Sequence, residues 1–386
     1  MFRKVAHAAA LGLLVAAGVM SSFALAGGKP PCWSNSPKKA AACFSSTTTN
    51  TPAGTTSSAA ATATVATPTT ATPTAATPTT TAPATTTATT PSSTSSPNCT
   101  KTLALGAGVG TVLNSLAPGQ VACLSSGNYA GDFTIQNSGV TLTAAPGANA
   151  TISGFIEIAD SANDVTISNL TIDGSSSPQN TLQIWGDRFH LLNSEVNGGH
   201  SSTTQDCVFI GHPTYGVAYD TVIDHDRIHG CGASGHGHGF YVKDSRGQTE
   251  ITNNYIYDNT NFNVQFYDDG DGVDFEHNVL DGAQTNAGLI FAGESSSASD
   301  NDTVRYNILT NNATYGITSY WGSFGVGTGN VADHNCFFGN GIAPIGSTVG
   351  WTNGAGNVFA DPLYVDRASK DFRLRAGSPC AGEGPS

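Results

Sequence analysis

A single lysine near the middle of the chain is the first candidate for chemistry. Lys243 is the only lysine between Lys101 and Lys370, and Asp244 follows it directly. Lysine shifts its pKa readily when it leaves water, so a lone lysine among carboxylates and aromatic residues could remove a proton from a substrate. The alternative is a surface charge paired with Asp244 or Asp268, because nearby carboxylates favour the ammonium form and oppose a base.

A cluster of acidic residues follows in the sequence DDGDG. It places Asp268, Asp269 and Asp271 close together. Calcium prefers hard oxygen ligands, so these carboxylates, with Asp244, could hold a calcium ion near the lysine. Asp and Gly are also the residues that tight turns favour, and the spacing is not that of an EF-hand loop. A third reading makes Asp244 and Asp268 the two carboxylates of a glycosidase.

Histidines supply further acid/base candidates. His236 and His238 lie in the stretch GHGHG, and His212 follows another predicted strand. Imidazole can move a proton near neutral pH or bind a metal ion. The plainer interpretation is that these are histidines without a metal in glycine-rich turns.

Aromatic residues recur at outward positions of the predicted strands. Side chains alternate between faces along a strand, and one outer column pairs aromatic positions with the lysine and carboxylates. Sugar rings pack their C–H faces on such side chains, whereas rings under long turns would simply pack there. The candidate substrate-binding residues are Trp185, Phe209, Tyr241, Tyr267, Tyr320 and Trp321.

A repeated pattern must position these side chains. One column carries Asn254, Asn278, Asn307 and Asn335 at steps of 24, 29 and 28 residues, and the position two residues further on is apolar in every unit. In-register columns of short alternating segments indicate a solenoid, because one unit cannot bury its own apolar face. Like residues would stack at the strand spacing of ~4.8 Å, with the asparagines forming hydrogen-bonded ladders.

Two further stretches resemble a known superfamily. LAPGQVACLSSGNYAGDFTI resembles the entry cap, and FADPLYVDRASKDFRLRAGSPCAG the closing segment, of the secreted, pectate-lyase-like right-handed parallel β-helix proteins. The resemblance covers about Cys99 to Gly384. It implies an all-β, right-handed parallel β-helix (solenoid), which hosts lyases, hydrolases, epimerases and non-catalytic adhesins. Residues 109–117 place four apolar residues on one helical face, which predicts a short N-terminal capping helix.

The chain before the solenoid divides into three segments. Residues 1–26 have the basic start, apolar middle and Ala24-Leu25-Ala26 site of a cleaved signal peptide. Residues 27–44 hold Cys32 and Cys43. Residues 45–98 are rich in Thr, Ser, Ala and Pro and should form a disordered linker, similar in composition to an O-glycosylated stalk. The β-helix domain would span 99–386.

Eight cysteines in an exported chain imply disulfides. Neighbours along the sequence suggest the pairs Cys32–Cys43, Cys99–Cys123, Cys207–Cys231 and Cys336–Cys380. None of the cysteines shows zinc-like spacing.

The composition limits the classes of molecule that this protein could bind. Only 11% of residues are charged and the net charge is −13, which does not fit a nucleic-acid-binding protein. We expect a secreted, monomeric protein that is free of the membrane after signal cleavage and that could associate with a cell wall. Two functions stay open. One is a polysaccharide lyase with Lys243 as base and calcium near Asp268, and the other is a non-catalytic carbohydrate-binding module. An acidic protein repels polyuronates unless cations bridge the two, so a neutral glycan also fits.

Overall fold

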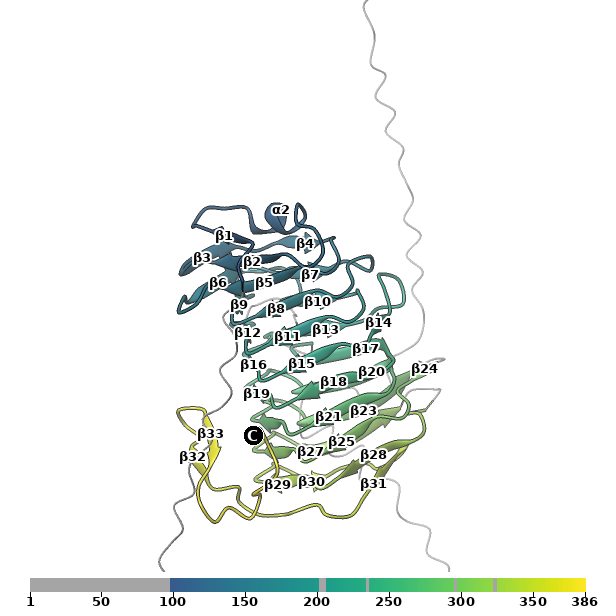
Figure 1. Ribbon diagram of the computed structural model, residues 1–386. Coiled ribbons are helices and arrows are strands. Elements are labelled where there is room, and N and C mark those ends of the chain that lie inside the picture. Colours follow the sequence, from purple (N-terminus) through teal and green to yellow (C-terminus); the bar gives the residue numbers. More distant parts are fainter. Residues whose placement is uncertain (1–97, 201–205, 234–235, 295–296, 322–324) are drawn as a thin grey trace, which may run out of the picture.

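The computed structural model describes residues 98–386, except 201–205, 234–235, 295–296 and 322–324. The predicted signal peptide, the segment 27–44, the linker up to residue 97 and the predicted pair Cys32–Cys43 lie outside these residues. The described part is a stack of solenoid turns whose parallel β-strands form three long sheets (Figure 1). The predicted all-β parallel β-helix is confirmed.

The chain passes once through each sheet in every turn of the solenoid. Sheet I contains β1 (Lys101–Leu103), β2 (Val121–Leu124), β5 (Thr141–Ala144), β8 (Thr166–Ser168), β11 (His190–Leu192), β15 (Val222–Asp224), β18 (Thr249–Thr252), β21 (Val273–Glu276), β25 (Thr303–Arg305), β28 (Asn330–Asp333) and β31 (Trp351–Asn353). Sheet II contains β4 (Phe133–Ile135), β7 (Ile156–Ile158), β10 (Leu182–Ile184), β13 (Val208–Ile210), β17 (Phe240–Arg246), β20 (Val264–Gly270), β23 (Leu289–Glu294), β27 (Tyr315–Trp321) and β30 (Ala343–Ile345), with β14 (Ala218–Tyr219) and β24 (Ser297–Ala298) at its side. Sheet III contains β3 (Gly127–Ala130), β6 (Ala150–Ser153), β9 (Thr171–Asp173), β12 (Glu195–Asn197), β16 (Arg227–His229), β19 (Tyr255–Tyr257), β22 (Val279–Asp281), β26 (Ile308–Thr310) and β29 (Cys336–Phe338).

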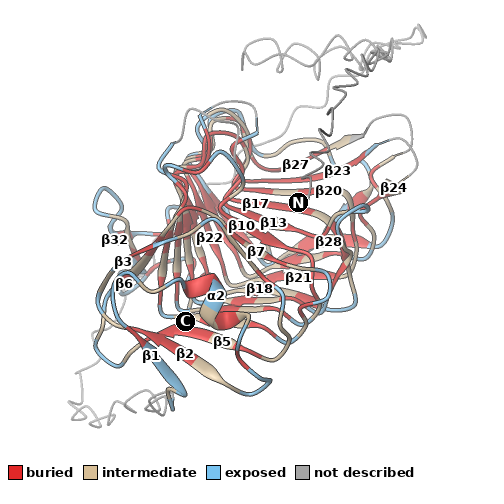
Figure 2. Cartoon of the chain, turned by 90° about the horizontal axis from the view of Figure 1, so that it is seen from above, coloured by how far each residue is buried: buried red, intermediate tan, exposed pale blue. Residues whose placement is uncertain are grey.

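The core is the set of inward columns predicted from the repeat. In sheet II, Val208, Phe240, Val264, Leu289 and Ile317 are register partners from strand to strand and are fully buried. Figure 2 shows buried positions along the strands of all three sheets, seen down the stack. Because alternate side chains point outward, the same register fixes which residues reach solvent or the turns.

The predicted asparagine ladder is also confirmed. The side-chain oxygens of Asn278, Asn307 and Asn335 each accept hydrogen bonds from the backbone N–H and side-chain amide of the preceding asparagine, at 2.8–3.1 Å. Each donating side chain is buried. The ladder therefore satisfies backbone groups at the corner between sheets I and III and links successive turns.

The two ends of the solenoid differ. The helix α2 (Val109–Leu113) buries Val109 and Leu113 and contacts β4. The Asn114 amide at its end donates to the Thr134 carbonyl at 2.9 Å and accepts from the Gln136 N–H at 2.8 Å. These hydrogen bonds satisfy two backbone groups at the outer edge of β4. At the other end, the hairpin of β32 (Tyr364–Asp366) and β33 (Asp371–Leu374) folds back over the outer face of sheet III.

Three disulfides confirm the predicted pairs in the described residues. They are Cys99–Cys123, Cys207–Cys231 and Cys336–Cys380. The first joins the entry to the solenoid, and the last ties the C-terminal segment to β29. Within the described ranges, no helix is both long and apolar enough to span a membrane.

Candidate functional site

The outer face of sheet II carries most of the predicted site residues. Trp185 follows β10 directly, Phe209 lies on β13, Tyr241 and Lys243 on β17, and Tyr267 on β20. Four successive turns of the solenoid therefore each contribute at least one of these residues. The regular register makes their side chains neighbours along the solenoid axis.

The rings form a continuous chain of contacts. Trp185 and Phe209 lie 5.4 Å apart edge to face, Phe209 stacks on Tyr241 at 4.8 Å, and Tyr241 meets Tyr267 edge to face at 6.0 Å between ring centroids. Tyr215, in the turn after β13, lies 5.6 Å from Trp185. We call these five rings the aromatic row. Offset and edge-to-face contacts of this kind stabilise the arrangement beyond area burial.

Burial divides the aromatic row into support and accessible surface. Trp185 and Tyr241 expose only 5% and 8% of their surface, whereas Phe209 and Tyr267 are half-buried and Tyr215 is 60% exposed. Burial also raises the pKa of the Tyr241 hydroxyl, and the nearby Asp206 carboxyl adds to this effect. A ligand on this face would therefore touch Phe209, Tyr215 and Tyr267, with Trp185 and Tyr241 holding them in place.

Lys243 is engaged in an ion pair. A bulge in the pairing of β17 with β20 sets Tyr267 and Asp268 together opposite Lys243. The ammonium donates to Asp268 Oδ1 at 2.9 Å and lies 5.3 Å from the centroid of the Tyr267 ring. Ser297 donates to the other Asp268 oxygen at 2.7 Å. In this geometry Lys243 offers a hydrogen-bond donor.

The remaining carboxylates predicted for calcium surround an arginine. Arg246 pairs with Asp269, lies 3.3 Å from Asp244 and lies 3.5 Å from Asp271. Burial raises the pKa of the Asp244 and Asp271 carboxyls, and the Arg246 guanidinium opposes this. Asp244 Oδ1 is buried and has no hydrogen-bond partner among the described residues, although the guanidinium is nearby. These carboxylates surround a guanidinium, which already neutralises part of their charge.

His212 lies at the edge of the aromatic row. Its ring centroid is 4.5 Å from that of Tyr215, and its Nδ1 accepts a hydrogen bond from the Thr214 N–H at 3.1 Å. Burial lowers the pKa of this imidazole, and Lys243 lowers it further while Asp268 raises it. The neutral ring therefore carries its proton on Nε2, because Nδ1 is an acceptor, and it can donate a hydrogen bond to a ligand.

The other two histidines are placed differently. His238 is buried against Tyr241 and Phe262, and its Nδ1 accepts from the Phe262 N–H at 3.3 Å. Burial lowers the pKa of His238 to about 3, so the ring is neutral and serves the packing beneath Tyr241. His236 is exposed on the turn, with its ring 6.2 Å from that of His238.

The last two predicted aromatic residues lie further along the solenoid. Tyr320 is on β27, where its register partner is Ala292, and it is half-buried. Trp321 pairs with Gly293 through its backbone. The strand β23 lies between their strand and that of Tyr267 in sheet II.

Four residues of the site were not singled out from the sequence. Tyr215 lies in a turn, Arg246 ends β17, Ser297 lies on the short strand β24, and Asp206 is buried beside the His238 backbone. Glu294 accepts a hydrogen bond from the Tyr267 hydroxyl. The one sequence signal for Tyr215 was its position: it is an aromatic residue two places after Pro213, in a turn of mostly small residues.

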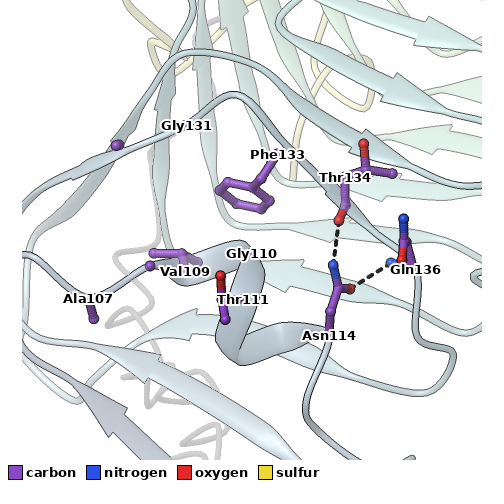
Figure 3. Close-up of a pocket in the computed structure, with 11 residues that line it drawn as sticks. Ala107, Val109, Gly110, Thr111, Asn114, Gly131, Phe133, Thr134 and Gln136 are labelled. Atoms are coloured by element: carbon purple, nitrogen blue, oxygen red, sulfur yellow. Dashed lines mark hydrogen bonds between the residues drawn. The ribbon is translucent and has the colours of Figure 1, made fainter. Parts of the chain in front are cut away.

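A pocket of the described chain lies elsewhere. Figure 3 shows a pocket of about 460 Å³ between α2 and the edge of β4, lined by Gly110, Gly131, Phe133 and other uncharged residues. It contains none of the predicted site residues.

Comparison with known proteins finds solved structures that resemble this chain at low sequence identity. No family model and no curated protein matches the sequence. Among solved structures, the chain is similar to pectate lyase Pel9A (12% identity, TM-score 0.47, covering 70% of this chain and 84% of that one). It is also similar to the Dettilon tailspike protein (12%, 0.45, covering 67% and 58%) and to PfbA, a surface adhesin of Streptococcus pneumoniae (14%, 0.39, covering 59% and 79%). The fold assignment rests on the strand pairing described above.

Proposed function

We propose that the protein is a secreted polysaccharide-binding β-helix whose ligand lies along the outer face of sheet II. The aromatic row carries this proposal. It runs across four successive turns, and its accessible members Phe209, Tyr215 and Tyr267 offer ring surface to sugar C–H groups. The three disulfides fit an oxidising, extracytoplasmic location.

Polar groups beside the row suit hydroxyl-rich ligands. Lys243 and His212 offer donors, and Asp268 and Glu294 offer carboxylate acceptors. Two carboxylates against one ammonium leave the polar end of the row negative, and the chain as a whole has a net charge of −13. A neutral glycan therefore fits this surface better than a polyuronate does.

Elimination from a uronate is the second candidate function. Lys243 would act as the base, and calcium at Asp244, Asp269 and Asp271 would neutralise the substrate carboxylate. Asp244 Oδ1, which accepts no hydrogen bond but lies 3.3 Å from the Arg246 guanidinium, favours a cation at this place. Two contacts oppose the reaction: Lys243 would have to leave Asp268 and lose its proton, and Arg246 competes with calcium for the carboxylates.

Retention on immobilised polysaccharides tests the proposal. The wild-type chain is run against neutral and uronate-containing glycans, with calcium or with a chelator, while unsaturated products and reducing ends are measured in parallel. Phe209→Ala and Tyr215→Ala should each weaken retention on the preferred glycan about tenfold, because buried stacking contacts are lost. Tyr219→Ala is the matched control, since Tyr219 is exposed but makes no ring contact with the row.

The outcomes separate the two functions. Retention on a neutral glycan, unchanged by the chelator and without products, supports the binding module. Calcium-dependent product formation that Lys243→Ala abolishes would establish the lyase instead. Retention that is equal in Phe209→Ala, Tyr215→Ala and Tyr219→Ala would remove this face from either function.

A further inference from the structure

The C-terminal end of the solenoid has an unusual surface. All three sheets end there, with β31, β30 and β29 as their last strands. Within the described ranges, β31 has a partner strand on one side only, and β29 is followed by a single bridge to Val358. At the opposite end, α2 and the Asn114 side chain contact β4, and the edge strand β1 carries the exposed Lys101. Free strand edges are normally protected, because they pair readily with other chains.

Charge does not provide that protection here. Residues 335–360, which form the last turn, contain no Asp, Glu, Lys, Arg or His. Charged side chains and proline are the usual means of blocking an edge. Pro344 in β30 serves this purpose for sheet II, but β31 has no proline and its Thr352 and Asn353 are exposed.

Apolar side chains collect at the same end. Phe338, Ile342, Val349 and Phe359 have 41–60% of their surface exposed. Phe359 stacks on the buried Phe337 at 5.6 Å, so it continues the core outward. Only three of the nine large apolar residues that are exposed in the described chain lie before residue 338. We call Phe338, Ile342, Val349, Phe359 and the edge of β31 the end face.

From these observations we propose that the end face binds a second copy of this chain, giving a two-fold symmetric, end-to-end dimer in place of the monomer expected from the sequence. An isologous contact sets each side chain against the same surface of its partner. Two copies with a net charge of −13 repel each other over most of their surface, and a charge-free face is where that repulsion is smallest. A contact of this kind would bury the apolar side chains and cover the free edge of β31.

The proposed contact leaves the polysaccharide face open. The end face belongs to the last turn, whereas the aromatic row lies on β10 to β20, several turns away. Two copies joined at this end would present two aromatic rows on one elongated particle. A single polysaccharide bound by both would be held more tightly than by either alone.

Sedimentation equilibrium of the full chain over a wide concentration series tests the proposal. The wild-type chain should dimerise reversibly. Val349→Asp and Ile342→Asp should each weaken dimerisation about tenfold or more, because they place like charges in an apolar two-fold contact. Tyr219→Asp, at an exposed position on β14, is the matched control and should leave dimerisation unchanged.

Circular dichroism of every variant checks that the β-helix is intact, so that a loss of association is not a loss of folding. A wild-type chain that is monomeric at all concentrations would overturn the proposal. So would a dimer that tolerates Val349→Asp and Ile342→Asp as well as it tolerates Tyr219→Asp. Because sedimentation is measured without glycan, this result is independent of the proposed polysaccharide binding.

Discussion

At the scale of single residues, the asparagine ladder contains one exception. Asp226 occupies the ladder position before Asn254, accepts from the Ser194 N–H at 2.6 Å and is fully buried. Its Oδ2 atom has no hydrogen-bond partner among the described residues, whereas the Asn254 amide donates to the Ile223 carbonyl. Burial raises the pKa of the Asp226 carboxyl well above its usual value. An asparagine would fit this position better at neutral pH.

We therefore expect Asp226→Asn to stabilise the protein. Removing an unsatisfied buried oxygen should raise the free energy of unfolding by about 1–3 kcal/mol at pH 7. The reverse change, Asn278→Asp, should lower it by a similar amount, because the donors to Ile251 O and Asn307 Oδ1 are lost. Urea denaturation of both variants measures the two effects. Equal destabilisation by both substitutions would show that the aspartate at position 226 stabilises the folded ladder.

Asp206 gives the clearest pH dependence. It is buried and accepts the His238 N–H at 2.9 Å, and burial raises the pKa of its carboxyl to about 8. An unfolded aspartate loses its proton near pH ~4, so between about pH 4 and pH 8 the folded state holds more protons. The free energy of unfolding must then fall as pH rises through this window.

Asp206→Asn should remove this loss. The stability gained over the wild-type chain should be small at pH 4 and should grow up to pH 8. Paired denaturation curves across this range measure the difference directly, because other titrating groups cancel between the two proteins. A gain that does not change with pH would mean that the carboxyl stays ionised in the folded state.

At the scale of elements, the sequence predicts what repeats and misses what does not. The columns through Asn254 and Phe240 indicated the register correctly, because each turn has the same apolar and amide requirements. Tyr215 and Asp206 lie in turns or connecting segments of variable length, and Arg246 ends β17 beyond its bulge, so no column aligned them. Pattern alone placed Trp185 and Tyr241 on the outer face but could not predict that neighbouring turns bury them.

The C-terminal hairpin is held by an ion pair between an exposed arginine and a buried carboxylate. Arg367 donates to both oxygens of Asp281 at 2.8 and 3.0 Å, and Asp281 is fully buried beneath the hairpin. Asp281 would keep its hydrogen bonds from Thr310 and Asn311 if Arg367 were removed. Arg367→Ala should therefore destabilise the protein by about 1–3 kcal/mol, less than for a completely unpaired buried charge.

A matched control lies on the same hairpin. Arg373 pairs with Asp371 at the surface, and its side chain is 74% exposed, so Arg373→Ala should change stability very little. Thermal denaturation of both variants, with proteolysis of the hairpin as a second readout, distinguishes them. If the two arginine variants were equally stable, the hairpin would be held by its apolar contacts with Tyr255 and Tyr257 alone.

At the scale of the whole molecule, the solenoid sets the spacing of the binding surface. Successive strands of a sheet lie ~4.8 Å apart, which is close to the length of one pyranose unit in an extended chain. The aromatic row takes one part from each of the strands β10, β13, β17 and β20, all along one axis. A polysaccharide parallel to this axis would span these four turns and touch their accessible rings, Phe209, Tyr215 and Tyr267.

Affinity should therefore depend on oligosaccharide length. Four turns offer about four positions at the strand spacing, so binding should strengthen with each added sugar up to about four and then level off. Calorimetry with a length series of the preferred glycan measures this. Tyr267→Ala should shorten the rising part by one sugar, whereas Phe209→Ala, in the middle of the row, should weaken every length. An affinity that is already maximal for a monosaccharide would mean that the ligand occupies one turn and does not follow the axis.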